Sequence, residues 1–270
     1  MTAATGAVSG IWRVFEHRFI VYRRTFRASL FSSFLTPALF LTAMGLGIGG
    51  YVDRAGPNAA LGGVPYIAFL APGLLVSSAM QTGSFEATFP VIAGLVWTRV
   101  FHAMYATPIT PRDVALGNIL WFGARLLLIS TVFTAVIVAF GAAVSPLIVL
   151  AIPVATLTGL AFATPIAAFS ATQRTPDRFA AIFRFGITPL FLFSGTFYPL
   201  EALPAFVQPL AWITPLYHGV VLARGLALGT IGTAALPLEL ALVHLLVLVA
   251  FIVVGTVATV YTVSAKLVRG

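Results

Sequence analysis

Three charged residues fall inside or at the edge of long apolar stretches of the chain: Glu86, Arg125 and Glu239. A charged group that faces lipid at the centre of a membrane helix costs about 2.5–3.5 kcal/mol, so such residues are usually paired or functional. Glu86 and Arg125 fall toward the same side of two consecutive apolar stretches, which predicts an ion pair. This pair is either a static lock between two helices or part of a transport mechanism. Glu239 opens the last apolar stretch, and we expect it to be solvated.

The sequence lacks the residues that metal sites, thiolate chemistry and ATP hydrolysis require. The chain has no cysteine, and its four histidines are widely spaced, which predicts no metal site and no thiolate chemistry. A phosphate-binding loop ends in Gly-Lys followed by Ser or Thr, whereas the only lysine, Lys266, is followed by Leu267. We therefore expect no catalytic residue, no bound cofactor and no ATP hydrolysis by this chain alone.

The composition is that of a membrane protein. The chain is 60% hydrophobic and 8% charged, whereas a soluble domain carries about 25% charged residues. The net charge of +8 is explained by the enrichment of Lys and Arg in cytoplasmic loops, without nucleic-acid binding. Lipid is therefore expected to cover much of the surface.

About 20 apolar residues are needed to cross a bilayer as a helix. Six segments fit, at about 28–50, 65–89, 115–140, 146–170, 180–199 and 236–262. Twelve of the fifteen Lys and Arg residues are cytoplasmic when both termini are placed inside, the orientation that the positive-inside rule favours. The sequence thus predicts one all-α integral membrane domain over residues 1–270, with six transmembrane helices.

Two further segments are expected at the membrane surfaces. Residues 9–27 alternate apolar and basic side chains at helical spacing, which predicts an amphipathic interfacial helix; an ordinary charged flank is the alternative. Residues 200–229 are apolar but interrupted by three prolines, and too short to cross twice. They predict a re-entrant extracellular hairpin before the last span, with a loop lying on the outer face as the alternative.

The stretch GLVWTRVFHAMYATPITPRDV, residues 94–114, interrupts the apolar segments on the cytoplasmic side. It predicts a short helix over about 92–107 followed by a Pro-containing turn. Trp97, Phe101 and Tyr105 recur at a spacing of four, with Arg99 and His102 off this stripe. Because aromatic and Arg side chains anchor protein interfaces, we expect this helix to dock on another protein.

Several motifs occur in one order along the chain: FLAPGLL at 69–75, GSFEATFPVIAGLVWTRVFHAMYATPITPRDVALGNILW at 83–121, FSGTFYPLEALPAFVQPLAWITPLYHGV at 193–220 and LARG at 222–225. In this combination the chain resembles the type-2 ABC exporter permeases, in particular the branch of NodJ and antibiotic-resistance exporters. The resemblance covers nearly the whole chain.

The resemblance implies a bacterial inner-membrane permease with six spans that dimerises and binds two separate ATPase subunits, which carry ATP and Mg²⁺. Homodimer and heterodimer both stay open. Segment 92–107 resembles the helix that couples such a permease to its ATPase, with contacts expected from Trp97, Arg99, His102 and Tyr105. Hairpin 200–229 resembles the helices that close the outer exit, where the gate candidates are Tyr198, Trp212, Tyr217 and His218.

Phe69, Met80, Phe85, Phe193 and Phe197 are the residues we expect to line the substrate path. The resemblance implies export of a lipophilic or amphiphilic substrate, such as a drug, lipid or glycolipid, out of the cytoplasm or the inner leaflet. Because the spans are apolar with few hydroxyl pairs, they favour a lipophilic drug or lipid over a polysaccharide. Two other functions stay open, an ion-coupled secondary transporter that depends on Glu86 and a non-transporting membrane scaffold.

Overall fold

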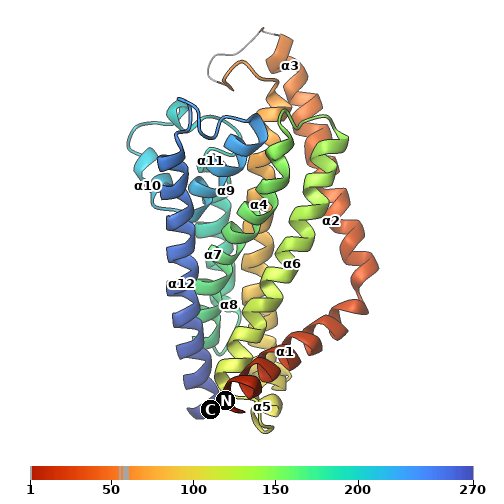
Figure 1. The fold of residues 1–270 in the computed structure, drawn as a ribbon, viewed down its shortest axis with the longest axis vertical. Coiled ribbons are helices and arrows are strands. Elements are labelled where there is room, and N and C mark those ends of the chain that lie inside the picture. Colours follow the sequence, from red (N-terminus) through yellow and green to blue (C-terminus); the bar gives the residue numbers. More distant parts are fainter. Residues whose placement is uncertain (1, 55, 57–60, 270) are drawn as a thin grey trace.

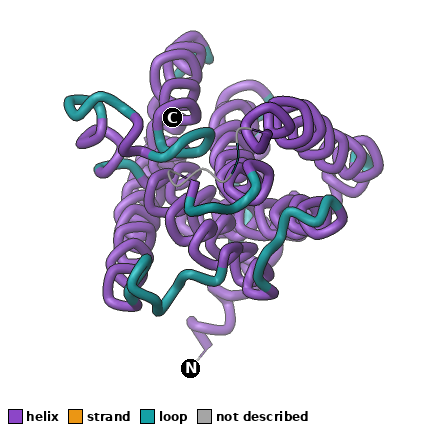
Figure 2. Tube along the Cα trace, turned by 90° about the horizontal axis from the view of Figure 1, so that it is seen from above, coloured by secondary structure: helices purple, strands orange, loops and turns teal. Residues whose placement is uncertain are grey.

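The computed structural model describes residues 2–54, 56 and 61–269, and within them it is a bundle of helices without a β-strand (Figure 1). Looking along the bundle, most helices are seen end-on and are joined by loops (Figure 2). Helix α1 begins at the same end of the molecule at which α12 finishes and α5 lies (Figure 1). An all-α fold is therefore confirmed.

The N-terminal helix α1 (Thr2–Arg23) lies obliquely across the foot of the bundle, and a short turn leads from it into α2 (Phe26–Phe40) (Figure 1). Helix α2 continues through a π-helical stretch (Leu41–Ile48) into α3 (Gly49–Arg54). Pro37 lies inside α2 and lacks the N–H group that a regular helix requires. The wider helical turns directly after it fit this interruption.

The stretch 94–114 connects the next two long helices along the chain. Helix α4 (Tyr66–Ile92) runs through the bundle and continues into a π-helical turn (Ala93–Trp97) before the short α5 (Val100–Tyr105). Helix α6 (Pro111–Ala139) starts with a reciprocal cap, in which the Thr110 and Asp113 side chains each accept a hydrogen bond from the other's backbone N–H. Asp113 is thus a capping residue.

The second half of the bundle contains one long helix and one broken helix. A 3₁₀ turn (Pro146–Leu150) leads into α7 (Ala151–Thr172). After a short loop, α8 (Asp177–Ala181), a π-helical stretch (Ile182–Ile187) and α9 (Thr188–Phe193) follow one another. The sequence placed a span at 180–199, whereas the helical part ends at Phe193, because Gly195 adopts a positive φ of 79° and Pro199 follows shortly.

Short elements fill the segment before the last helix. They are a 3₁₀ turn (Leu200–Ala202), α10 (Gln208–Trp212) and α11 (Pro215–Leu228), and α12 (Leu238–Arg269) follows them. Helices α10 and α11 lie at the end of the bundle opposite α5 (Figure 1). Pro209 and Pro215 each occupy the first turn of a helix, where the missing N–H needs no partner.

Four helical segments among the described residues are long and apolar enough to cross a membrane: Ser29–Arg54, Pro111–Ala139, Pro146–Thr172 and Leu238–Arg269. Helix α4 and the broken helix α8–α9 run in the same bundle (Figure 1). The count of six spans stays a prediction.

Two clusters of buried apolar residues hold the bundle together. The larger is built mainly from α4, α7 and α11 and includes Leu70, Met80 and Leu216. The smaller lies toward the end where α1 and α5 meet the bundle, and includes Val14 and Phe101. Because this second cluster joins the oblique α1 to α4, α5 and α6, it positions the segments expected to contact a partner protein.

Candidate functional site

An ion pair lies where four helices meet. Arg125 Nε on α6 is 3.5 Å from Glu86 Oε1 on α4, and the two side chains are 11% and 17% exposed. Arg125 also donates hydrogen bonds to the hydroxyls of Tyr22 and Ser29. Trp121 Nε1 donates to Glu86 Oε2 over 3.3 Å. The structure thus brings Glu86 and Arg125 together, and it adds three partners that the sequence reasoning did not identify.

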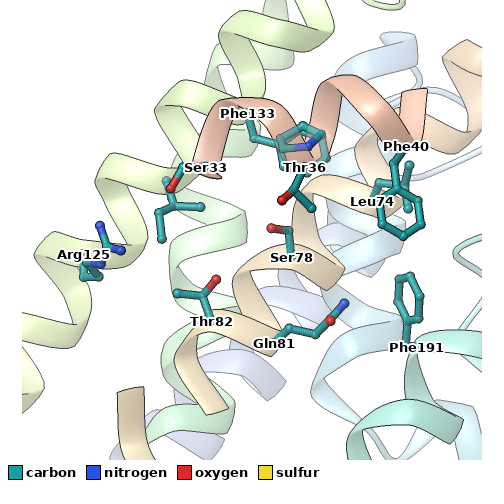
Figure 3. A pocket seen from close by; sticks show the side chains of 12 residues that line it. Ser33, Thr36, Phe40, Leu74, Ser78, Gln81, Thr82, Arg125, Phe133 and Phe191 are labelled. Atoms are coloured by element: carbon teal, nitrogen blue, oxygen red, sulfur yellow. The ribbon is translucent and has the colours of Figure 1, made fainter. Parts of the chain in front are cut away.

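Beside Arg125 lies a cavity of about 270 Å³ between α2, α4, α6 and α9. Its polar wall comes from two helices (Figure 3), with Ser33 and Thr36 on α2 facing Ser78, Gln81 and Thr82 on α4. Arg125 on α6 also lines the cavity, and the rest of the wall is apolar and consists of Pro37, Phe40, Leu74, Ile129, Phe133 and Phe191. We call this the hydroxyl cavity.

Besides Arg125, five polar side chains line the hydroxyl cavity, and four of these have no side-chain hydrogen bond within the described part of the chain. Thr36, Ser78, Gln81 and Thr82 form no hydrogen bond with any described residue, whereas Ser33 donates to the carbonyl of Ser29 over 2.7 Å. Hydroxyls in membrane helices commonly bond to a carbonyl one turn back, as Thr131 does on α6. Free donors and acceptors around a cavity are suited to a ligand that carries hydrogen-bonding groups.

A second cavity, of about 390 Å³, lies between α1 and α6. Its walls are almost entirely aromatic and aliphatic and come from Phe15, Phe19, Tyr22, Phe26, Trp121, Ala124 and Leu128, with Arg23 and Arg125 at its edge. We call this the aromatic slot. Arg125 lines both cavities, so a hydrogen-bonding compartment and an apolar compartment lie on either side of one guanidinium.

The five residues expected to line the path are dispersed, and none lines the hydroxyl cavity or the aromatic slot. Phe69 and Met80 are buried in the core. Phe85 is half exposed and packs on Phe89, with ring centres 5.5 Å apart. The two residues near the end of α9 differ: Phe197 packs edge-on against Phe191, which lines the cavity, and Phe193 is partly exposed.

Three of the four gate candidates lie together near the end of the bundle opposite α5 (Figure 1). The Nδ1 atoms of His218 and His244 are 2.6 Å apart, and His218 Nε2 is 2.8 Å from the carbonyl oxygen of Trp212. The ring of Tyr217 lies edge-on to both imidazoles. Tyr198 lies in the loop after α9. His244, which the sequence reasoning left unassigned, is therefore the residue that ties this group to α12.

Arg224 has a structural role that the sequence analysis did not identify. Its guanidinium donates hydrogen bonds to the carbonyls of Phe69, Gly195 and Thr196, at 3.2, 2.8 and 3.4 Å. It also lies 3.7 Å from the centre of the Phe69 ring. Arg224 thus joins α11 to α4 and to the loop after α9, and the LARG motif at 222–225 was the available signal.

The expected docking helix is shorter than predicted. The prediction that Trp97, Phe101 and Tyr105 form one aromatic stripe for a partner was wrong. Arg99 has a φ of 52°, in the left-handed region, so α5 begins only at Val100. Trp97 and Tyr105 are exposed, but Phe101 is 2% exposed and packs in the core. The surface left for a partner consists of Trp97, Arg99 and Tyr105, with His102 half-buried beside them.

Arg18 on α1 connects this docking segment to the bundle. Its Nε donates to Asn118 Oδ1 on α6 over 2.8 Å, and its Nη2 to the carbonyl of Pro90 over 3.4 Å. Burial lowers the pKa of Arg18 from its ordinary value, an effect that the nearby Glu86 carboxylate opposes. A buried cation with these bonds holds α1, the end of α4 and α6 at fixed distances.

A family model described as ABC-2 type transporter matches residues 9–228 of the chain. The chain belongs to this family. Nodulation protein J of Rhizobium leguminosarum bv. trifolii is 31% identical over 85% of this chain and 85% of its own. Nodulation protein J of Rhizobium leguminosarum bv. viciae is 29% identical over the full length of both. The inner membrane transport permease YadH of Escherichia coli (strain K12) is 26% identical over 86% of each chain.

Membership of the ABC-2 type transporter family confirms the resemblance to type-2 ABC permeases. The chain is a permease subunit embedded in the membrane, and permeases of this family work with ATPase subunits. The match begins within α1 and ends at the last residue of α11. It therefore includes both cavities, the docking segment and the outer histidine His218.

Proposed function

We propose that the chain is the transmembrane subunit of an ATP-driven exporter, which acts as a dimer with two separate ATPase subunits in a bacterial inner membrane. Both termini face the cytoplasm, and the ATPase docks on the surface formed by Trp97, Arg99 and Tyr105. ATP and Mg²⁺ bind to the ATPase, and this chain supplies the path. The family match and the exposure of these three side chains support this assignment.

The proposed cargo is an amphiphile with an apolar chain and a head group rich in hydrogen-bonding groups. The observation that carries this proposal is the pair of cavities that share Arg125, one hydroxyl-lined and one aromatic. The sequence left an amphiphilic cargo open but favoured a lipophilic drug or lipid over a polysaccharide, because the spans contain few hydroxyl pairs. In the folded chain, Thr36, Ser78, Gln81 and Thr82 converge on one cavity instead, which supports a polar head group (Figure 3).

Entry from the inner leaflet fits the position of the aromatic slot. The slot lies between the amphipathic α1 and α6, near the end of the bundle where α5 lies (Figure 1). Such a helix rests at the interface with its apolar face toward the acyl chains. A lipid-like tail can therefore occupy the slot while the head group passes Arg125 into the hydroxyl cavity.

Co-purification tests the ATP-driven assignment. A tagged permease, gently solubilised from its host, is expected to carry along a subunit with a phosphate-binding loop that hydrolyses ATP. A permease that purifies alone and transports in response to an ion gradient would be an ion-coupled carrier instead.

ATP hydrolysis by the reconstituted complex tests the cargo class. We expect a long-chain alkyl glycoside to stimulate hydrolysis more than a fatty alcohol of the same chain length. Thr36→Val and Thr82→Val remove a hydroxyl at constant volume and should abolish this difference. Thr131→Val, on an exposed face of α6, should preserve it. Equal stimulation by both probes in the unaltered protein would contradict an amphiphilic cargo.

A further inference from the structure

A basic cavity of about 380 Å³ lies where α7 and α12 end, apart from both cavities described above. Three cationic side chains line it, Arg174 from the loop after α7 and Lys266 and Arg269 from the last turns of α12. The remaining wall carries two hydroxyls and a phenol and consists of Ala171, Thr172, Tyr261, Thr262 and Ala265. Its lining contains no acidic residue.

The three cations of this cavity have no counter-charge within the described part of the chain. None of them forms an ion pair or donates a hydrogen bond there. The carbonyl ends of helices attract cations. This attraction alone does not explain why cations from two separate elements converge on one cavity that is also lined by hydroxyls. Three neighbouring positive charges repel one another, so the folded arrangement favours binding of an anion.

The depth of the cavity in the membrane follows from α12. Val254 and Val257 are largely exposed on this helix, as expected for side chains that face lipid. Tyr261 comes next and is 70% exposed, and tyrosines of membrane helices gather at the level of the lipid head groups. At 1.5 Å per residue, Lys266 lies about 7.5 Å beyond Tyr261 and Arg269 about 12 Å beyond it. Long Lys and Arg side chains reach back toward the head groups from such positions, so their charged ends come within reach of a lipid phosphate.

We propose that this cavity binds the phosphate of an anionic phospholipid in the leaflet nearest the docking segment, which is the inner leaflet in the proposed orientation. Lys266, Arg269 and Arg174 hold the phosphate. The hydroxyls of Thr172 and Thr262 donate to helix carbonyls, so their oxygens accept hydrogen bonds from a glycerol head group. The acyl chains lie along the exposed valines of α12. Basic pockets between helices on the cytoplasmic side are suited to such head groups. The site is separate from the cargo cavities, so the lipid is a structural partner.

Lipid retention measured by native mass spectrometry tests this site. The permease, with its ATPase if one co-purifies, is placed in nanodiscs of phosphatidylcholine with a minor fraction of phosphatidylglycerol. The lipids that stay bound to the protein after its release from the nanodisc are counted. We expect phosphatidylglycerol to be enriched over phosphatidylcholine. Lys266→Gln and Arg269→Gln should each weaken its binding about fivefold, the value of one cation near an anionic surface.

A matched control separates a built site from a generally basic surface. Arg112→Gln removes an exposed charge at the start of α6, outside the cavity, and should leave retention unchanged. Lys266→Arg keeps the charge and should retain binding. If Lys266→Gln does not fold, the exposed loop residue Arg174 provides the same test as Arg174→Gln.

Three results would overturn the proposal. Equal loss of lipid in Arg112→Gln and Lys266→Gln would show a non-specific basic surface. Displacement of the lipid by excess inorganic phosphate would show a site for free phosphate. Unchanged lipid binding together with lost ATPase association in Lys266→Gln would make this surface an ATPase contact. Failure of the lipid site leaves the proposed export function untouched, because co-purification tests that function independently.

Discussion

The guanidinium carbon of Arg18 lies 5.3 Å from the centre of the Phe101 ring. Phe101 is the buried residue of α5, and its ring also packs against Gly94, where an added Cβ would lie 2.5 Å from it. Arg18 in turn bonds to Asn118 and to the carbonyl of Pro90. The docking segment is covalently joined to α4 and α6, and the contact between Arg18 and Phe101 connects it to α1 as well.

Arg18→Met tests this connection, because it keeps an apolar stem and removes the donors. Loss of hydrogen bonds to a charged group costs about 1.5–3 kcal/mol each, so we expect a lower unfolding temperature. We also expect ATPase association to persist while stimulation of hydrolysis by cargo is lost. Arg13→Met, an exposed change on the same helix, is the control. Normal stimulation in Arg18→Met would show that coupling bypasses this residue.

A double-mutant cycle on Glu86 and Arg125 separates a static lock from a transport role. Removing either partner leaves the other charged group poorly compensated, so Glu86→Gln and Arg125→Gln should each destabilise the permease. The double variant should lose less stability than the sum of the two single losses, with an interaction free energy of about 0.5–3 kcal/mol. If the double variant regains stability and transport, the pair is a lock. If it regains stability alone, the charges take part in transport. Glu239→Gln, at the exposed start of α12, is the control.

The docking surface is tested by Trp97→Ala combined with Arg99→Ala. Both side chains are exposed, so we expect normal membrane insertion and an unchanged unfolding temperature. Association with the ATPase should be lost in pull-down, since aromatic and Arg side chains dominate interface energies. Phe206→Ala alters an exposed aromatic residue in the outer segment and should leave association intact. Unchanged association in the double variant would place the ATPase contact elsewhere.

The long apolar runs were enough to predict an all-helical membrane bundle, because in lipid only a helix satisfies its backbone groups within one segment. The start of α6 was also readable in principle, since Thr110 and Asp113 have the spacing of a reciprocal cap. Helix ends were harder to predict, because they depend on local backbone conformation. The left-handed φ of Arg99 turned Phe101 into the core, and no pattern in the sequence marks a non-glycine residue for that conformation.

The candidate site was only partly predictable, because it depends on which faces of distant helices meet. Glu86 and Arg125 stood out, since each is a single charge in an apolar run. The hydroxyls of Thr36, Ser78 and Thr82 looked like ordinary helix residues, and only the approach of α2 to α4 gathers them into one cavity. Phenylalanines were expected to line the path because several lie beside Gly and Pro in a broken helix, yet this neighbourhood does not indicate which rings face a cavity.

Helices α4 and α7 lie very close together beside the hydroxyl cavity, and glycine makes that spacing possible. A Cβ at Gly83 would lie 2.5 Å from the carbonyl oxygen of Gly159 on the facing helix, a backbone atom that cannot rotate away. Small residues allow membrane helices to approach this closely. Gly83 directly follows Thr82, which lines the hydroxyl cavity, so a shift of α4 at this point changes the cavity wall.

Gly83→Ala should therefore destabilise the permease by about 1–3 kcal/mol, the cost of overpacking, and weaken the preference for the alkyl glycoside. Gly123→Ala is the matched control on α6, where the nearest atom to an added Cβ is 3.8 Å away. There the better helix propensity of alanine should raise stability by up to about 1 kcal/mol. Unfolding temperatures measured in one detergent compare the two variants directly. If both variants were stabilised alike, α4 and α7 would lie farther apart than this contact requires, and the hydroxyl cavity would not depend on their close approach.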